Sequence, residues 1–258
     1  MNSKPVALIT GASGGIGEQI ARELAARYHL VLVARSTDKL SALASSLASA
    51  ETIALDLSRS DAVDSLTRTL HERGLEVSVL VNNAGFADYG EFWQADATKL
   101  LEMVNLNVVT LTMLTRALLP GMVARKQGKI MNVASTAAFM PGPLMSVYYA
   151  SKAYVLSFSE GLSGELEGTG VSVTALCPGP VETGFQTRAA MEGSKLLKDP
   201  MNPTMDSVTV AKAAVSALEA RQRVVIPGFM NQMLAVLPRF LPRAFVPGIV
   251  KNAQARGH

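Results

Sequence analysis

Two side chains capable of acid–base chemistry, Tyr148 and Lys152, are four residues apart in the segment Tyr-Tyr-Ala-Ser-Lys. Residues four apart in a helix project from one face, so a helix that begins here brings the phenol and the ammonium together. A nearby positive charge favours the phenolate and brings the tyrosine pKa of about 10 closer to neutral. The pattern predicts a tyrosine that exchanges a proton with a carbonyl or an alcohol, and the alternative is a surface Tyr/Lys pair. Tyr149 is the competing phenol and is interpreted as packing or pocket wall.

A glycine-rich stretch, Thr-Gly-Ala-Ser-Gly-Gly-Ile-Gly at residues 10–17, follows the first β-rich run. Glycines let the backbone approach a pyrophosphate, and a helix that begins behind them presents free N–H groups and its positive dipole end. The position between a strand and a helix predicts a dinucleotide site, although tight strand–helix packing alone would also use glycines. The predicted contacts on this loop are Gly11, Ser13, Gly14, Gly15, Ile16 and Gly17.

The end of the second β-rich run reads Val-Ala-Arg-Ser at residues 33–36, where a carboxylate would bind the ribose 2′-hydroxyl of NAD. No carboxylate stands there. Arg35 can instead donate charge-assisted hydrogen bonds to a 2′-phosphate, with the Ser36 hydroxyl as a second donor. The sequence favours NADP(H), with NAD(H) still possible. The alternative is that Arg35 points into solvent or pairs with Asp38.

The elements that position these residues alternate along the chain. The predicted strands are 6–9, 30–33, 52–55, 77–81, 129–133, 171–176 and 224–226, and the predicted helices are 16–27, 38–47, 62–71, 106–123, 148–166 and 208–218. Strand and helix in alternation indicate an α/β fold with a doubly wound parallel sheet and helices on both faces. With 258 residues, 48% of them hydrophobic, and no linker within the first 180, we expect a single domain over residues 1–258.

Taken together, the motifs resemble those of the short-chain dehydrogenase/reductase family. They are the spacing Gly11-x-x-x-Gly15-x-Gly17, Asp56-Leu57, Asn82-Asn83-Ala84-Gly85, Asn107, Ser135, Tyr148-x-x-x-Lys152 and Pro178-Gly179 followed by Thr183. The resemblance runs from the N-terminus to about residue 185. It implies one Rossmann-type domain, commonly in a dimer or tetramer, that moves a hydride to or from a nicotinamide cofactor.

The resemblance also implies roles for single residues around the reacting atoms. Tyr148 would be the acid/base, and Ser135 would hydrogen-bond the reacting oxygen. Lys152 would bind the nicotinamide ribose, and Asn107 would hold a water that links this lysine to solvent. Asn105 is the competing asparagine, but the spacing from Asn107 to Ser135 fits the family pattern without a gap.

For the cofactor, the resemblance implies that Asp56 holds the adenine amino group, that backbone at residues 83–85 flanks the adenosine ribose, and that Thr183 hydrogen-bonds the carboxamide. The predicted cofactor-binding residues outside the glycine loop are Arg35, Ser36, Asp56, Leu57, Asn83, Ala84, Gly85, Tyr148, Lys152, Pro178, Gly179, Val181 and Thr183.

Mainly apolar side chains occupy the segments expected around a substrate pocket. They are Phe86, Phe139, Met140, Leu144, Met145, Phe185 and Met191. They predict a mainly apolar ketone or aldehyde, or the corresponding alcohol, as the substrate, although the same residues could be ordinary core. The polar stretch 186–206 is interpreted as a substrate lid. A non-catalytic NADP(H)-binding regulatory protein and a membrane-associated lipid ketone reductase are the alternative functions.

Residues 229–258 form a basic, apolar extension. Six Lys or Arg and no Asp or Glu follow Ala220, whereas the rest of the chain has 18 basic and 21 acidic residues. The positive charge is therefore local, and a nucleic-acid-binding surface is not indicated. Three prolines prevent one long amphipathic helix, which favours packing of the extension over binding to a membrane surface but leaves the latter open.

The remaining observations exclude other chemistry and suggest a location. Cys177 is the only cysteine and no His is near it, so it is interpreted as a small buried residue and no disulfide or metal site is expected. No run of about 18 uninterrupted apolar residues and no secretory signal is seen, so we expect a cytoplasmic protein.

The segment 106–123 carries apolar residues on more than one side, which predicts a second partner surface beyond the sheet. By the resemblance, this helix and the one that contains Tyr148 would pair with their copies in a homodimer or homotetramer. The alternative is that the C-terminal extension covers the same surface within one chain.

Overall fold

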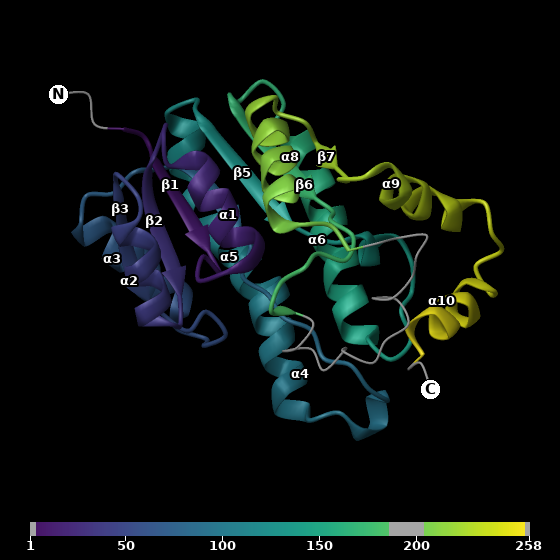
Figure 1. Cartoon of the computed structure of the whole chain (residues 1–258). Helices are drawn as coiled ribbons and strands as arrows, with labels where there is room; N and C mark the ends of the chain where they lie inside the picture. The colour runs from purple at the N-terminus through teal and green to yellow at the C-terminus, as the bar shows by residue number, and fades with distance from the viewer. Residues whose placement is uncertain (1–3, 186–203, 256–258) are drawn as a thin grey trace.

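Seven parallel strands form one sheet in the order β3-β2-β1-β4-β5-β6-β7 in the computed structural model, which describes residues 4–185 and 204–255 (Figure 1). The strands are β1 (Val6–Thr10), β2 (His29–Ala34), β3 (Ala50–Ala54), β4 (Val77–Asn82), β5 (Gly128–Val133), β6 (Val171–Leu176) and β7 (Val224–Val225). The strand order reverses between β1 and β4, and in such sheets ligands bind beyond the carboxyl ends of the strands at this point. The predicted parallel α/β sheet is confirmed.

Helices cover both faces of the sheet. One face carries α1 (Gly15–Leu24), α2 (Thr37–Ser45) and α8 (Ser207–Glu219), and the other carries α3 (Ala62–Glu72), α5 (Leu111–Ala124) and α6 (Ser146–Glu165). Successive side chains of a strand point to opposite faces, so Ile9 packs in the first of these two cores and Leu8 in the second. Both cores are therefore built from short, nearly continuous apolar strands.

The helix predicted at 106–123 begins earlier than expected. α4 (Ala97–Val104), a π-helical turn η2 (Asn105–Thr110) and α5 continue one another, and the Asp96 carboxylate caps α4 by accepting the Thr98 N–H at 2.8 Å. This helix, Ala97–Ala124, is long and apolar enough to cross a bilayer by length and composition. It packs on β4 and β5 as a layer of the fold, so these two properties alone carry no membrane assignment.

The C-terminal extension packs on the rest of the chain, as predicted. It forms α9 (Phe229–Val236), a short turn η5 (Leu237–Arg239) and α10 (Val246–Gln254), which lie on the side of the molecule farthest from β3 (Figure 1). Val246 and Val250 of α10 join the apolar cluster that contains Tyr148 and Tyr149. The extension therefore borders the predicted pocket, and it leaves Val109 and Met113 on the outer side of the long helix exposed. The alternative in which the extension covers the helix 106–123 is wrong.

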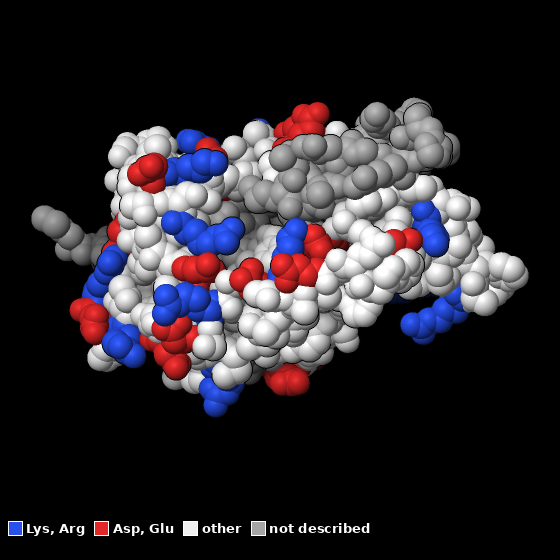
Figure 2. Space-filling model, turned by 90° about the horizontal axis from the view of Figure 1, so that it is seen from below, with Lys and Arg blue, Asp and Glu red and all other residues white. Residues whose placement is uncertain are grey.

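Basic and acidic side chains are intermingled on the face shown in Figure 2. The ion pairs of the described residues include Arg59–Asp61 at 2.9 Å and Arg73–Glu51 at 2.6 Å. This face therefore presents no broad field of one sign.

Candidate functional site

The glycine loop joins β1 to α1 and is held by Asn83, which follows β4. The Asn83 Nδ2 group donates to the carbonyl oxygens of Thr10 at 2.9 Å and Gly11 at 3.1 Å. A Cβ at Gly11 would lie 2.8 Å from this amide nitrogen, and one at Gly17 would collide with it, so both positions require glycine. Gly14 has no other heavy atom within 4 Å of its Cβ position. The loop is thus fixed from the Asn83 side and open beside Gly14, ahead of the N-terminus of α1.

Arg35 follows β2 and is largely exposed, with 70% of its side chain accessible. Its guanidinium lies 3.9 Å from the Asp56 carboxylate, so its ionic partner among the described residues is Asp56 rather than Asp38, the partner considered as an alternative. Burial raises the pKa of Asp56, but hydrogen bonds from the Ser58 N–H and hydroxyl, together with Arg35, hold it below its usual range. Ser36 precedes α2, directly beside this pair.

The loop after β6 approaches the glycine loop from the other side. A Cβ at Gly15, whose φ is +58°, would lie 3.0 Å from the Thr183 Cγ2 atom. Val181 is buried and bridges to Met205. A Cβ at Gly179 would collide with the buried Asn231 amide of α9. The Pro-Gly turn therefore also packs against the C-terminal extension. This packing gave no signal in the sequence.

Other predicted cofactor residues use their groups within the protein. The Ala84 N–H donates to the Thr10 hydroxyl at 3.0 Å. Leu57 is buried in the core, and its carbonyl accepts the Thr110 hydroxyl at 2.7 Å. The Pro178 carbonyl accepts the Thr136 N–H at 2.9 Å. These positions are therefore structural, whatever contact they make with a cofactor.

Tyr148 and Lys152 lie in the first two turns of α6, and both are buried. The Lys152 ammonium donates to the Val133 carbonyl at 2.7 Å and lies 5.8 Å from the centre of the Tyr148 ring. Ser135 follows β5 and accepts the Ala137 N–H at 3.1 Å, which starts the turn η3 (Thr136–Phe139). The carboxyl end of β5 and the start of α6 thus bring Ser135, Tyr148 and Lys152 together.

Burial dominates the electrostatics of this group. It raises the pKa of Tyr148, while the Ser135 side chain lowers it by a smaller amount. Burial also lowers the pKa of Lys152 to about 8. The described protein groups alone therefore do not bring the Tyr148 pKa toward neutral; because that expectation also invokes the positive nicotinamide ring of a bound cofactor, it stays a prediction.

Asn107 lies in the π-helical turn η2, a feature frequently found at functional sites. Its side chain accepts the Phe86 N–H at 3.1 Å and donates to the Ser151 hydroxyl at 3.1 Å. A Cβ at Gly85 would lie 3.0 Å from Asn107 Oδ1 and 3.5 Å from Lys152 Nζ. Gly85 therefore leaves a space that both of these side chains border, whereas the competing Asn105 is partly exposed.

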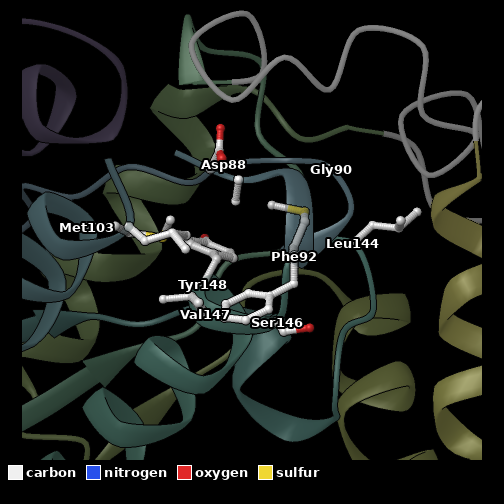
Figure 3. A pocket seen from close by; sticks show the side chains of 11 residues that line it. Asp88, Gly90, Phe92, Met103, Leu144, Ser146, Val147 and Tyr148 are labelled. Carbon is white, nitrogen blue, oxygen red and sulfur yellow. The ribbon is translucent and has the colours of Figure 1, made fainter. Parts of the chain in front are cut away.

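A small hollow that is open to solvent lies in front of Tyr148 (Figure 3). Leu144 and Met145 line it as predicted, and the Phe185 ring lies 5.6 Å from the Tyr148 ring. On the opposite wall, Asp88 lies in the segment 86–89 that the sequence placed near the pocket, whereas the rest of that wall was missed and consists of Gly90, Phe92, Ala95, Leu100 and Met103. Asp96 as a helix cap before the apolar residues of 100–104 is the signal that could have revealed it.

Not all residues predicted for the pocket lie there. Phe86 and Met140 pack in the cluster around Tyr148 and Tyr149. Phe139 packs instead in the core that contains Val155 and Cys177, because η3 ends with this ring directed toward β6 and α6. Met191 and most of the predicted lid 186–206 lie outside the described residues.

Tyr149 and Cys177 are structural residues, as interpreted from the sequence. Tyr149 is buried, and its hydroxyl receives a hydrogen bond from Gln254 of α10. Cys177 is completely buried, and burial raises its pKa to about 12. In the part of the chain that the structure describes, no three His, Cys, Asp or Glu side chains form a group suited to a metal ion.

Fold and site together define an α/β oxidoreductase of the dinucleotide-dependent class. A family model described as short chain dehydrogenase matches residues 5–192. The chain is 33% identical to the very-long-chain 3-oxoacyl-CoA reductase of Mus musculus over 267 aligned positions, which cover 97% of this chain and 81% of the mouse protein. This chain therefore belongs to the short-chain dehydrogenase/reductase family, as the motifs predicted, and is an NAD(P)-dependent oxidoreductase of CH–OH and C=O groups.

Solved structures give the same assignment. A short-chain dehydrogenase from Sphingobium yanoikuyae in complex with NADPH has a TM-score of 0.81 and 35% identity, covering 92% of this chain and 91% of that one. The bulky-bulky ketone specific alcohol dehydrogenase from Comamonas testosteroni has a TM-score of 0.77 and 29% identity, covering 94% and 97%.

Proposed function

We propose that this chain reduces a mainly apolar ketone or aldehyde with NADPH, or oxidises the corresponding alcohol, with Tyr148 as the acid/base. The observation that carries the proposal is the meeting of Tyr148, Ser135 and Lys152 at the edge of an apolar pocket. A protein that only binds a nucleotide has no need of this proton-transfer group.

The cofactor site fits NADP(H). The open side of the glycine loop at Gly14 and the N-terminus of α1 suit a pyrophosphate, and the exposed Arg35 suits a 2′-phosphate. Ser13, Gly15, Ile16, Asp56 and Thr183 complete the proposed site, and the relative from Sphingobium yanoikuyae was solved with NADPH. When bound, this cofactor supplies the hydride. Nothing in the geometry forbids NAD(H), which lacks only the phosphate that Arg35 would bind.

The raised pKa of Tyr148 keeps its phenol protonated at neutral pH, as the proton donor of a reduction must be. Ser135 hydrogen-bonds the same substrate oxygen and aligns it with the phenol. Lys152, held by the Val133 carbonyl, binds the nicotinamide ribose, and Asn107 positions the water through which the lysine exchanges protons with solvent.

The pocket supports an uncharged substrate. Phe92, Leu100 and Met103 form one wall, and the acidic group on the rim, Asp88, is neutralised by Lys99 at 2.5 Å. Two relatives act, by their names, on carbonyl compounds with a large apolar part, although the first of these also carries a charged CoA group: a very-long-chain 3-oxoacyl-CoA and a bulky-bulky ketone. We propose bulky or long-chain ketones as the substrate class and the cytoplasm, where Cys177 stays reduced, as the location.

The test is to incubate the protein with NADPH and a panel of carbonyl compounds and to follow the absorbance of NADPH. The panel contains 3-oxoacyl thioesters of increasing chain length, bulky diaryl ketones and polar keto-sugars. We expect kcat/KM to be highest for the apolar members. Turnover restricted to the sugars would refute the substrate class, and NADPH binding without any turnover would favour the regulatory alternative.

A further inference from the structure

The C-terminal helix α9 has its apolar side facing outward. Phe229, Met233 and Val236 are spaced as one helical face, and all three are exposed, with Phe229 75% accessible. The opposite face is the buried one, and it carries Asn231 and Ala235. A helix packed only for the stability of its own chain would have the reverse arrangement, so this face requires a partner.

The same pattern continues through η5 and α10. Val246, Val250 and Gln254, at intervals of four, are buried against the body of the protein. Phe245 and Ile249, also four apart, point outward. The exposed large apolar residues of the extension, called the C-terminal apolar face here, are Phe229, Met230, Met233, Val236, Leu237, Phe240, Phe245 and Ile249. The helices that carry them lie together on one side of the molecule (Figure 1).

The charge on this segment is of one sign. Arg239, Arg243 and Lys251 are exposed between the apolar residues, and the ion pairs of the described residues include none of them. No Asp or Glu follows Ala220 in the chain. A two-fold contact between copies would place the same patch on both subunits and bring these cations together without a counter-charge. The anionic headgroups of a lipid bilayer would neutralise them instead.

We propose that the C-terminal apolar face binds the surface of an anionic lipid bilayer, with its aromatic and aliphatic side chains in the headgroup region and its cations on the phosphates. The inner face of α10 contacts the cluster around Tyr148 and Tyr149. Binding through the outer face would therefore leave the contact between α10 and this cluster in place. This proposal does not depend on the substrate proposed above.

Flotation of the full-length protein with vesicles tests the proposal. One set of vesicles is phosphatidylcholine alone, and the other mixes phosphatidylcholine with phosphatidylglycerol. We expect binding to the mixed vesicles and a loss of at least about tenfold in the triple variant Phe229→Ser/Met233→Ser/Phe240→Ser, because three apolar side chains no longer leave water.

The matched control is Trp93→Ser/Leu101→Ser/Val208→Ser, which removes three exposed apolar side chains elsewhere on the surface. We expect it to float as the unmodified protein does. An equal loss in both triple variants, or no flotation of the unmodified protein, would overturn the proposal. A third result would also overturn it: the unmodified protein does not bind vesicles, and light scattering shows that Phe229→Ser/Met233→Ser/Phe240→Ser changes it from a dimer to a monomer. The partner of the C-terminal apolar face would then be a second copy of the chain.

The charge is tested separately with Arg239→Gln/Arg243→Gln, in which every apolar residue is kept. Each arginine should contribute about fivefold to binding of anionic vesicles and nothing to phosphatidylcholine alone. A variant that binds mixed vesicles undiminished would show that the cations do not meet lipid headgroups, against the proposal. Unchanged thermal unfolding of each variant establishes that it is folded.

Discussion

Tyr148 and Tyr149 are adjacent phenols with different surroundings. Tyr148 faces Ser135 and the pocket, whereas the Tyr149 hydroxyl is taken by Gln254 and burial raises its pKa to about 12. We predict that Tyr148→Phe lowers kcat by at least about 100-fold, because the proton donor is lost. NADPH binding, measured by fluorescence titration, should persist. Tyr149→Phe should lower kcat only mildly, and the reverse ranking would mean that Tyr149 is the acid.

The buried Lys152 makes stability depend on pH. Its pKa is about 8 in the folded chain and about 10.4 when unfolded, so between these values the unfolded chain binds more protons. The free energy of unfolding of the cofactor-free protein should therefore rise with pH over this window. Relative to Lys152→Met, which cannot titrate, we expect a rise of up to about 3 kcal/mol between pH 7 and pH 10. Urea unfolding at both pH values measures the free energy of unfolding of each protein. If that free energy changed with pH equally in the unmodified protein and in Lys152→Met, the lowered pKa of Lys152 would be contradicted.

Arg35 is the residue on which the cofactor preference rests. Among the described residues the ionic partner of its exposed guanidinium is Asp56, 3.9 Å away, so we expect the guanidinium to be available to a 2′-phosphate. Arg35→Asp should weaken NADPH binding by about 1.5–3 kcal/mol or more, because a charge-assisted hydrogen bond is replaced by repulsion. NADH binding should change little or improve. Equal affinity of the unmodified protein for both cofactors, measured by titration, would remove the basis for this preference.

At the scale of elements, polar contacts of Gln254 hold α10 against the cluster that contains Tyr148 and Tyr149. The Tyr89 hydroxyl donates to the Gln254 carbonyl at 2.8 Å, and the buried Gln254 side chain donates to the Tyr149 hydroxyl. Gln254→Leu should lower the free energy of unfolding by about 1–3 kcal/mol, because the Tyr149 hydroxyl loses a buried partner. It should also raise KM for bulky ketones more than for small ones.

The control for this helix is Asn252→Leu, at an exposed position of α10 two residues away. A surface substitution of this kind should change stability by less than about 0.5 kcal/mol. Chemical denaturation of the two variants compares them directly. Equal effects would mean that α10 is held by its apolar residues, with no special part for Gln254.

The order and type of most elements could be predicted because each strand is a short apolar run bounded by turns. The boundaries of β6 agree with those predicted, and the glycine loop lies between a strand and a helix as expected. α4 was not predicted because most of its apolar residues are not buried and do not pack on a face of the sheet. The contact between Asn231 and Gly179 could not be predicted, because the residues around a turn do not specify which distant helix packs against it.

For the site, too, local spacing could be predicted from the sequence but contacts between distant elements could not. Tyr148 and Lys152 could be placed together from their spacing, because one helix carries both. The missed pocket wall comes from Phe92, Leu100 and Met103, whose approach to Tyr148 depends on how α4 packs against α6. The electrostatics also depended on the whole structure, since the burial that raises the Tyr148 pKa is created by several elements at once.

At the scale of the whole molecule, the outer side of the long helix and of α6 is apolar and uncovered. Val109, Met113 and Tyr154 are exposed, and Tyr154 stacks on Phe158 at 5.8 Å between ring centres. The extension lies elsewhere and does not cover them. We propose that this surface pairs with its copy across a two-fold axis, where no like charges of the C-terminal extension would meet.

We predict a dimer or tetramer at micromolar concentration, and a shift toward the monomer in Met113→Glu. Met113 is half exposed at 50%, so the single chain tolerates the carboxylate, but a two-fold contact would bury two of them close together. Trp93→Glu, at a more exposed apolar site outside this surface, should leave the mass unchanged. Light scattering of the three proteins decides. A monomeric unmodified protein would refute the two-fold contact through the apolar side of the long helix.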